Sequence, residues 1–232
     1  MRQVWITRIG PPEVLELREA SDPTPGPGQV RIRVRAIGIN FADIMARLGL
    51  YPDAPKLPAV IGYEVAGDID AVGSGVQRAP GEKVLALTRF GGYSDVVCVH
   101  EGQAIPLPPG MSYEEGAAVP VNYLTAYQIL VQMGSLKRGE RALIHSAAGG
   151  VGLAAIDLCA TFAAPRSSGL LLRPSTPCCA NAVSGTRSTI ARRIMRLRSN
   201  ASPADVAYTS CWMQWAVSIG RRATAAWQQP GA

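Results

Sequence analysis

The sequence predicts a β-rich front domain followed by the start of a parallel α/β sheet, and three observations support this prediction. Apolar and polar residues alternate over several short segments of the front part, as they do in half-buried strands. Turns rich in glycine and proline separate these segments. Further along, a short apolar run leads through a glycine turn into a helical segment, which is the typical opening of a βαβ unit.

The front segments predict strands over residues 4–17 and 30–36, joined by a proline-rich turn at 22–28. Further strands are expected around 59–61, 65–72, 83–87 and 93–99. Many short strands at this spacing predict a small β-barrel. Arg31, Arg33 and Arg35 share one face of their strand, and we interpret that face as solvated rather than as a nucleic-acid-binding stripe.

Helical signals begin after the predicted barrel. Ser112 and Glu115 have the spacing of a capping box, and a second helix is expected over residues 122–133. Residues 141–145 then predict a short buried strand, and the glycine turn at 146–152 leads into a helix that continues to Cys159. Strand, turn and helix together predict a nucleotide-binding βαβ start.

The glycine turn has the chemistry that a pyrophosphate requires. Backbone N–H groups at a helix N-terminus attract a phosphate, and glycine lets it approach where a Cβ would collide. Gly149, Gly150 and Gly152 therefore predict a dinucleotide site. The acidic residue that would bind a ribose about 20 residues later is missing, which weakly favours a cofactor with a 2′-phosphate.

Composition narrows the class of protein. Of the 232 residues, 47% are apolar and 17% are charged, as in a soluble globular chain. No apolar run approaches the roughly 20 residues of a membrane span, and no signal peptide is evident at the N-terminus. The five cysteines form neither a disulfide framework nor a C-x-x-C zinc pattern. We therefore expect a cytoplasmic protein without a membrane partner.

Several ordered motifs carry a family resemblance. They are Asn40-Phe41-Ala42-Asp43 with Arg47, Gly49 and Tyr51; Gly62-Tyr63-Glu64; Ala117-Ala118; Leu124-Thr125-Ala126-Tyr127; and Ala147-Ala148-Gly149-Gly150-Val151-Gly152. Up to about residue 159 the chain resembles the zinc-free quinone oxidoreductase branch, zeta-crystallin-like, of the medium-chain dehydrogenase/reductase superfamily. The resemblance implies a GroES-like β-barrel substrate domain over residues 1–115. Over 116–159 it implies the start of a Rossmann doubly wound parallel sheet that binds NADPH.

The activity implied by the resemblance is hydride transfer from NADPH to a quinone or another α,β-unsaturated carbonyl. Zinc-dependent relatives hold their metal with a Cys and a His, but this chain has Tyr63 at the His position and no Cys before Cys98. Thiolate and imidazole are the ligands that zinc requires, so no metal site is expected. Without a metal, the acceptor carbonyl is polarised by hydrogen bonds.

The candidate catalytic residues on the substrate side are Asn40 and Tyr51. Thr125 is the candidate partner of the nicotinamide carboxamide. The phosphate-binding candidates are Ala148, Gly149, Gly150, Val151 and Gly152. Simpler roles are also open: Asn40 as a turn former, Tyr51 as a loop tyrosine beside Pro52, and Thr125 as a helix residue bonded to its own backbone.

Residues 160–232 differ sharply from the rest. They carry nine Arg and one acidic residue, Asp205, whereas residues 1–159 carry 14 basic and 16 acidic residues. Periodicity also stops near Cys159. Back-translating residues 211–216 and regrouping the bases by one position gives Leu, Asp, Ala, then Val or Met, then Gly, and the reading Leu-Asp-Ala-Val-Gly fits a strand and turn of this family. We therefore hypothesise that a frameshift near Cys159 leaves residues 160–232 as an out-of-frame, non-native tail, and we expect it to be disordered.

Two other functions stay open. An enoyl-thioester reductase shares the zinc-free architecture and differs mainly in its acceptor pocket. A basic-tailed, non-enzymatic binding protein could attract nucleic acid or acidic lipid through the tail. We favour a small-molecule quinone or enone substrate with no specific nucleic-acid partner. The family resemblance also implies frequent homo-oligomers, and truncation of the second domain predicts little activity for this chain.

Overall fold

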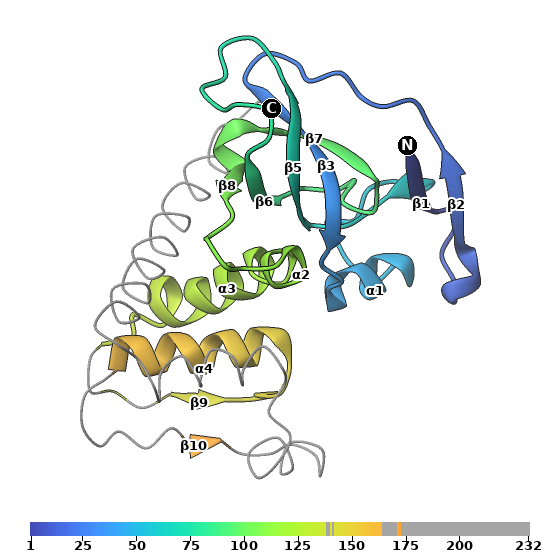
Figure 1. Ribbon diagram of the computed structural model, residues 1–232. Helices are drawn as coiled ribbons and strands as arrows, with labels where there is room; N and C mark the ends of the chain where they lie inside the picture. The colour runs from blue at the N-terminus through green and yellow to red at the C-terminus, as the bar shows by residue number, and fades with distance from the viewer. Residues whose placement is uncertain (138–139, 141, 164–170, 173–232) are drawn as a thin grey trace. The chain divides into compact units, whose positions relative to one another are not determined.

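The computed structural model describes residues 1–137, 140, 142–163 and 171–172 (Figure 1). These residues belong to two compact units, Met1–Val121 and Asn122–Ala232. The division falls after Val121, whereas the sequence analysis placed the domain boundary after residue 115. Each unit is described separately below.

The front unit is built on a five-stranded antiparallel sheet with the order β7-β3-β5-β6-β8 (Figure 1). Its strands are β3 (Gln29–Ile37), β5 (Glu64–Val72), β6 (Lys83–Leu87), β7 (Val96–His100) and β8 (Ala104–Pro106). Apolar side chains from these strands form one core, which includes Val30, Ile32, Val65, Ile69 and Val84. The predicted strands are confirmed, and β8 is an addition to them.

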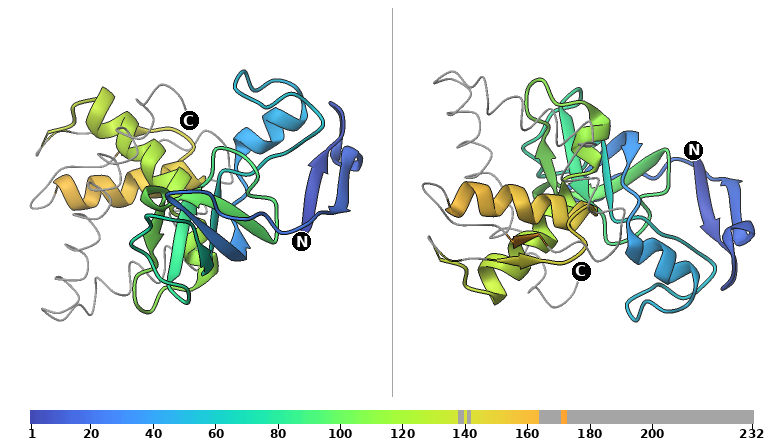
Figure 2. Two further views of the ribbon diagram at one scale, coloured as in Figure 1. Left: turned by 90° about the horizontal axis from the view of Figure 1, so that it is seen from above. Right: turned by 90° about the horizontal axis from the view of Figure 1, so that it is seen from below.

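A second, three-stranded sheet has the order β2-β1-β4. Strand β1 (Arg2–Ile6) pairs antiparallel with both β2 (Leu15–Glu19) and β4 (Ala59–Val60), and a 3-10 turn, Pro12–Val14, precedes β2. Helix α1 (Phe41–Arg47) lies beside this sheet in both views of Figure 2. The buried side chains here are Ile6, Val14, Ala46 and Ile61, with Tyr51, Ala54, Leu57 and Tyr93 packed against them.

The arginines of β3 form ion pairs along the solvated face of the sheet. Arg31 Nε lies 2.8 Å from Asp70 Oδ1, and Arg35 Nε lies 2.9 Å from Asp68 Oδ2. Arg33 reaches Asp70 at 2.9 Å. Two carboxylates of the neighbouring strand thus pair with all three arginines, which agrees with the interpretation of the row as a solvated face.

The helical region after the sheet begins with the predicted capping box. In helix α2 (Tyr113–Ala117) the Glu115 N–H donates to Ser112 Oγ at 3.2 Å, and the Ser112 N–H donates to Glu115 Oε2 at 2.9 Å. The single helix expected over 122–133 is instead α3 (Pro120–Tyr127) followed by a π-helical segment, Gln128–Met133. None of the helices within the described ranges is long and apolar enough to cross a membrane.

The second unit contains a βαβ arrangement. Strand β9 (Leu143–Ile144) is shorter than the predicted 141–145, and helix α4 (Gly150–Ala163) runs past residue 159. Strand β10 (Leu171–Leu172) pairs in parallel with β9, as a βαβ unit requires. A parallel strand therefore lies inside the segment expected to be non-native. The rest of that predicted tail, apart from the end of α4, lies outside the described residues.

Candidate active site

Asn40 stands at the N-cap of helix α1, with φ −114° and ψ 157°. Its backbone N–H donates to Asp43 Oδ2 at 2.7 Å, and its carbonyl accepts from the Asp43 N–H at 3.0 Å. Asparagine suits an N-cap because its side-chain oxygen can accept a hydrogen bond from an N–H of the first helical turn. The amide nitrogen is also engaged: Nδ2 donates to Glu64 Oε1 at 2.8 Å. Asn40 is thus both a helix-start residue and a member of a side-chain network.

Glu64 is the buried centre of that network and is only 1% exposed. Its second oxygen, Oε2, accepts from the Val121 N–H at 2.8 Å, and its backbone carbonyl accepts from the Gly38 N–H at 3.1 Å. Burial raises the pKa of the Glu64 carboxyl to about 7, although the N–H groups of Val121 and Asn40 oppose the rise. A carboxyl group that changes charge near neutral pH therefore contacts a candidate catalytic side chain.

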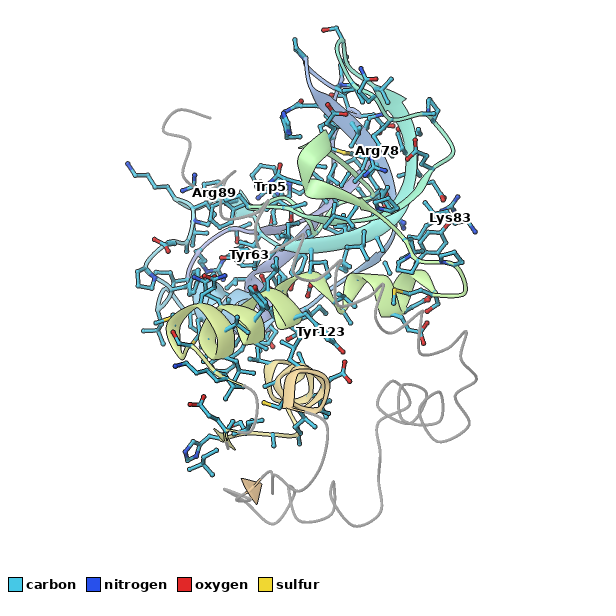
Figure 3. The ribbon with its side chains drawn as sticks, turned by 90° about the vertical axis from the view of Figure 1, so that its left-hand side faces the viewer. Trp5, Tyr63, Arg78, Lys83, Arg89 and Tyr123 are labelled. Carbon is cyan, nitrogen blue, oxygen red and sulfur yellow. The ribbon has the colours of Figure 1, made fainter. Side chains whose placement is uncertain are left out.

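Tyr51 lies in an aromatic cluster. Its ring centroid is 6.1 Å from that of Tyr63, edge to face at 74°, and the Tyr63 ring is 5.6 Å from that of Phe90. The Tyr63 carbonyl accepts from the Thr88 N–H at 2.8 Å, and Tyr63 is labelled in Figure 3. The Tyr63 hydroxyl is buried, and none of the residues that the structure describes lies within hydrogen-bonding distance and geometry of it. Burial raises its pKa above the ordinary value, so this group stays protonated and available as a donor.

Asp43 is a second buried carboxyl close to Asn40 and is 3% exposed. Burial raises the pKa of Asp43, while the Asn40 N–H acts in the opposite direction. Oδ2 is bonded to that N–H, whereas Oδ1 has no hydrogen-bond partner at bonding distance and geometry among the described residues. Two carboxyl groups of raised pKa thus flank the Asn40 residue.

The glycine turn joins β9 to α4 within the second unit. Ser146 adopts a left-handed conformation with φ 52°, and its carbonyl accepts from the Gly149 N–H at 2.9 Å. The Gly149 carbonyl accepts from the Leu153 N–H at 2.8 Å, which makes Gly149 the N-cap of α4. The next three N–H groups, from Gly150 to Gly152, precede the first intrahelical donor. Those groups are the ones that a helix offers to a phosphate.

Two of the three glycines pack closely, Gly152 against backbone atoms and Gly150 against the end of a side chain. A Cβ at Gly152 would lie 2.5 Å from the Ser146 carbonyl oxygen and 2.7 Å from Ala147 Cα, and one at Gly150 would lie 2.8 Å from Asn122 Cγ. At Gly149 the nearest atom would be 3.3 Å away. Gly150 and Gly152 therefore let the helix approach the turn and α3 closely, and Gly149 is the least restricted of the three.

Thr125 lies half-buried on α3, between Asn122 and the buried Ala126. Asn122 abuts Gly150, and residues three apart share a helix face, so Thr125 follows on the face that meets the start of α4. Thr125 and the glycine turn therefore belong to one unit, whereas Asn40 and Tyr51 belong to the other.

Sequence reasoning quoted Glu64 within a motif but did not name it as a site residue. Its signal was a lone carboxylate in the mainly apolar stretch 59–67. Within the described part of the chain, no group of three or more His, Cys, Asp or Glu side chains is placed to hold a metal ion. Tyr63 occupies the position at which the zinc-dependent relatives were expected to have a ligand.

The two sheets of the front unit and the βαβ start of the second unit define the class of protein: a β-rich front domain followed by the start of a parallel α/β domain. The alcohol dehydrogenase GroES-like domain family matches residues 26–109. Among curated proteins, the synaptic vesicle membrane protein VAT-1 homolog of Rattus norvegicus is 50% identical over 148 residues, 63% of this chain and 37% of the rat protein. A quinone oxidoreductase of Pseudomonas aeruginosa is 37% identical over 219 residues, 90% of this chain and 66% of that protein.

The solved structures that resemble this chain include a quinone oxidoreductase as well. The Escherichia coli quinone oxidoreductase complexed with NADPH has a TM-score of 0.65 and 36% identity, covering 70% of this chain and 50% of its own. The CurK enoyl reductase has a TM-score of 0.70 and 28% identity, covering 85% and 64%. The chain belongs to the zinc-free quinone oxidoreductase branch of the medium-chain dehydrogenase/reductase superfamily, which it matches in part.

The matches cover different shares of this chain and of each relative. The chain spans about a third of the rat protein and half of the E. coli enzyme. The alignment with the P. aeruginosa protein covers 90% of the 232 residues, so it must extend beyond residue 159.

Proposed function

We propose that the protein is an NADPH-dependent reductase that transfers hydride to a quinone or another α,β-unsaturated carbonyl. The observation that carries the proposal is the glycine turn of a parallel βαβ unit, found in one chain with a front domain that offers hydrogen-bond donors. The relatives named quinone oxidoreductase, one of them solved with NADPH, support the choice of cofactor and acceptor.

The second unit fits a dinucleotide at the turn between β9 and α4. The N–H groups of the first helical turn, which have no acceptor within the helix, and the positive end of a 14-residue helix favour a pyrophosphate. We assign Ala148, Gly149, Gly150, Val151 and Gly152 to the phosphates and Thr125 to the carboxamide side. When bound, NADPH supplies the hydride. The residues of this unit bind and orient it.

The front unit supplies the acceptor side. We propose that Asn40 and Tyr51 donate hydrogen bonds to the acceptor carbonyl and stabilise the negative charge that develops on its oxygen. Asn40 Nδ2 has two N–H groups, of which Glu64 uses one. The Tyr51 ring belongs to the aromatic cluster with Tyr63 and Phe90, which suits a planar ring substrate.

A second candidate is enoyl-thioester reduction. The likeness to the CurK enoyl reductase covers more of this chain than the likeness to the E. coli quinone oxidoreductase. Both reactions deliver hydride to a carbon conjugated with a carbonyl, so the same donors would serve. The acceptor therefore has to be decided by measurement.

We further propose that this chain has little activity as it stands. A Rossmann crevice needs several neighbouring parallel strands, and the described residues supply one pair, β9 and β10. An out-of-frame segment after residue 159 would explain this. Reading the coding DNA across codons 155–165 tests it: an intact frame would remove the frameshift from the proposal.

The decisive functional assay uses the chain with its frame restored near codon 159. NADPH oxidation is followed with 1,4-naphthoquinone and, separately, with crotonyl-CoA, each with and without a metal chelator. We expect turnover with the quinone that the chelator leaves unchanged. Faster turnover with crotonyl-CoA would favour the enoyl reductase, and loss of activity on chelation would contradict the zinc-free assignment.

A further inference from the structure

The segment Gly62-Tyr63-Glu64 contacts both candidate acceptor-side residues. The Tyr63 ring packs against Tyr51, and the Glu64 carboxyl accepts a hydrogen bond from Asn40 Nδ2. Consecutive residues at the start of β5 thus hold the two side chains on which the acceptor chemistry depends. The contact to Asn40 is the more specific of the two, because it fixes a polar group directly.

We propose that Glu64 is a positioning residue, which orients the Asn40 amide so that its second N–H serves as the donor to the acceptor carbonyl; this inference rests on the proposed function. A carboxylate only accepts hydrogen bonds, so an ionised Glu64 must face Nδ2 and not Oδ1. An amide fixed in this way keeps one N–H for a ligand. A freely rotating amide would present its oxygen in part of the population and would repel a carbonyl.

The surroundings hold the Glu64 carboxyl in one place. Oε2 is bonded to the Val121 N–H at 2.8 Å, and the side chain is 1% exposed. Gly38 packs against it so closely that a Cβ there would overlap the carboxyl group. With both oxygens bonded and no space beside it, the carboxyl group transmits its orientation to Asn40.

Protonation of Glu64 should change the orientation of the Asn40 amide, and this change can be measured. A protonated carboxyl carries an O–H donor that can bond Asn40 Oδ1, so Nδ2 is no longer required to face Glu64. The charged and titratable groups that act on Glu64 are Asp43 of α1 and Tyr93, which precedes β7. Burial raises the pKa of Tyr93, so it remains neutral, and burial raises the pKa of Asp43 as well. The Asn40 amide should therefore be fixed with Nδ2 toward Glu64 only above the Glu64 transition.

The first experiment follows the Asn40 side-chain amide resonances of the full chain by ¹H–¹⁵N NMR between pH 5 and 9. We expect a single transition near neutral pH, where the pKa of Glu64 lies at about 7. Asn40→Asp identifies the resonances by their disappearance. Resonances that do not move over this range would overturn the proposal, and this measurement on the unmodified chain needs no Glu64 variant.

The second experiment repeats the titration in Glu64→Gln, with Glu114→Gln on the exposed start of α2 as the matched control. The transition should vanish in the first variant and persist in the control. A transition that persists in Glu64→Gln would assign it to Asp43 and overturn the proposal.

A binding arm separates this inference from the proposed function. With 1,4-naphthoquinone as the probe, Glu64→Gln should weaken binding roughly 2- to 10-fold, as expected for one misplaced hydrogen bond. The same change should have no effect in an Asn40→Ala background. Equal weakening in both backgrounds would overturn the positioning role. If the NMR transition is found but neither protein binds quinone, the orientation by Glu64 stands and the proposed acceptor falls.

Discussion

Gly38 and Glu64 pack so tightly that position 38 admits no side chain. The Gly38 N–H donates to the Glu64 carbonyl at 3.1 Å, and a Cβ on residue 38 would overlap the Glu64 carboxyl group. The glycine at the end of the first long strand is thus required by the buried carboxyl 26 positions later in the printed sequence. The acceptor side of the proposed site depends on this contact.

Gly38→Ala should lower the free energy of unfolding of the front unit by about 1–3 kcal/mol, the usual cost of overpacking a buried position. The measurement is urea denaturation followed by tryptophan fluorescence. Gly102→Ala is the control, because its Cβ would lie 3.4 Å from the nearest atom, an ordinary contact. Equal stability of the two variants would show that the Glu64 carboxyl moves freely away from Gly38.

The raised pKa of Glu64 predicts a pH dependence of stability. The folded state holds its proton up to about pH 7, whereas the unfolded chain releases it near 4.5. Between these values the folded state binds more protons, so stability falls as the pH rises, by at most about 3 kcal/mol. Glu64→Gln should flatten this slope, as judged by urea midpoints at pH 5 and pH 8. A slope that is the same in both proteins would contradict the assignment.

Removal of the Tyr63 hydroxyl should not destabilise the fold, unlike removal of a hydroxyl that forms a hydrogen bond. Because this oxygen is buried and no described residue forms a hydrogen bond with it, Tyr63→Phe should leave the free energy of unfolding unchanged or raise it by up to about 1 kcal/mol. Thr88→Val is the matched variant, since Thr88 Oγ1 donates to the Gly62 carbonyl at 2.7 Å. That change should destabilise by about 1–3 kcal/mol. Thermal denaturation compares the two, and a clear loss in Tyr63→Phe would reveal a bond to its hydroxyl.

The glycine turn predicts a contrast between two alanine variants. Gly152→Ala places a Cβ 2.5 Å from the Ser146 carbonyl oxygen, so it should loosen α4 against the turn by about 1–3 kcal/mol. Gly149→Ala meets its nearest atom at 3.3 Å and should have a much smaller effect. Amide hydrogen exchange in α4 measures both. Similar protection in the two variants would remove the packing role of Gly152.

Local sequence patterns were sufficient to predict much of the fold. The strand predicted at 83–87 coincides with β6, and the Ser112–Glu115 capping box starts α2 because both of its hydrogen bonds are local. Helix α1 was missed because seven residues with an exposed Phe41 and Ile44 give no clear apolar stripe. Such a helix depends on its N-cap and on tertiary contacts.

The candidate site was less accessible to sequence reasoning. Asn40 and Tyr51 were named through the family resemblance, but the partner that orients Asn40 lies on another strand, and no spacing rule links residues 40 and 64. The cluster of glycines between a predicted strand and a predicted helix did indicate the turn at 149–152. It could not tell that Gly152 serves packing while Gly149 is less constrained, because this depends on the path of the Ser146 backbone.

The account is tested most directly by titrating NADPH, with nicotinamide fluorescence as the signal, into the chain as given and into its frame-restored form. The front unit and the glycine turn are common to both. We predict saturable micromolar binding by the restored chain and none by the chain as given. Saturable micromolar binding by the chain as given, or its absence in the restored chain, would contradict the account.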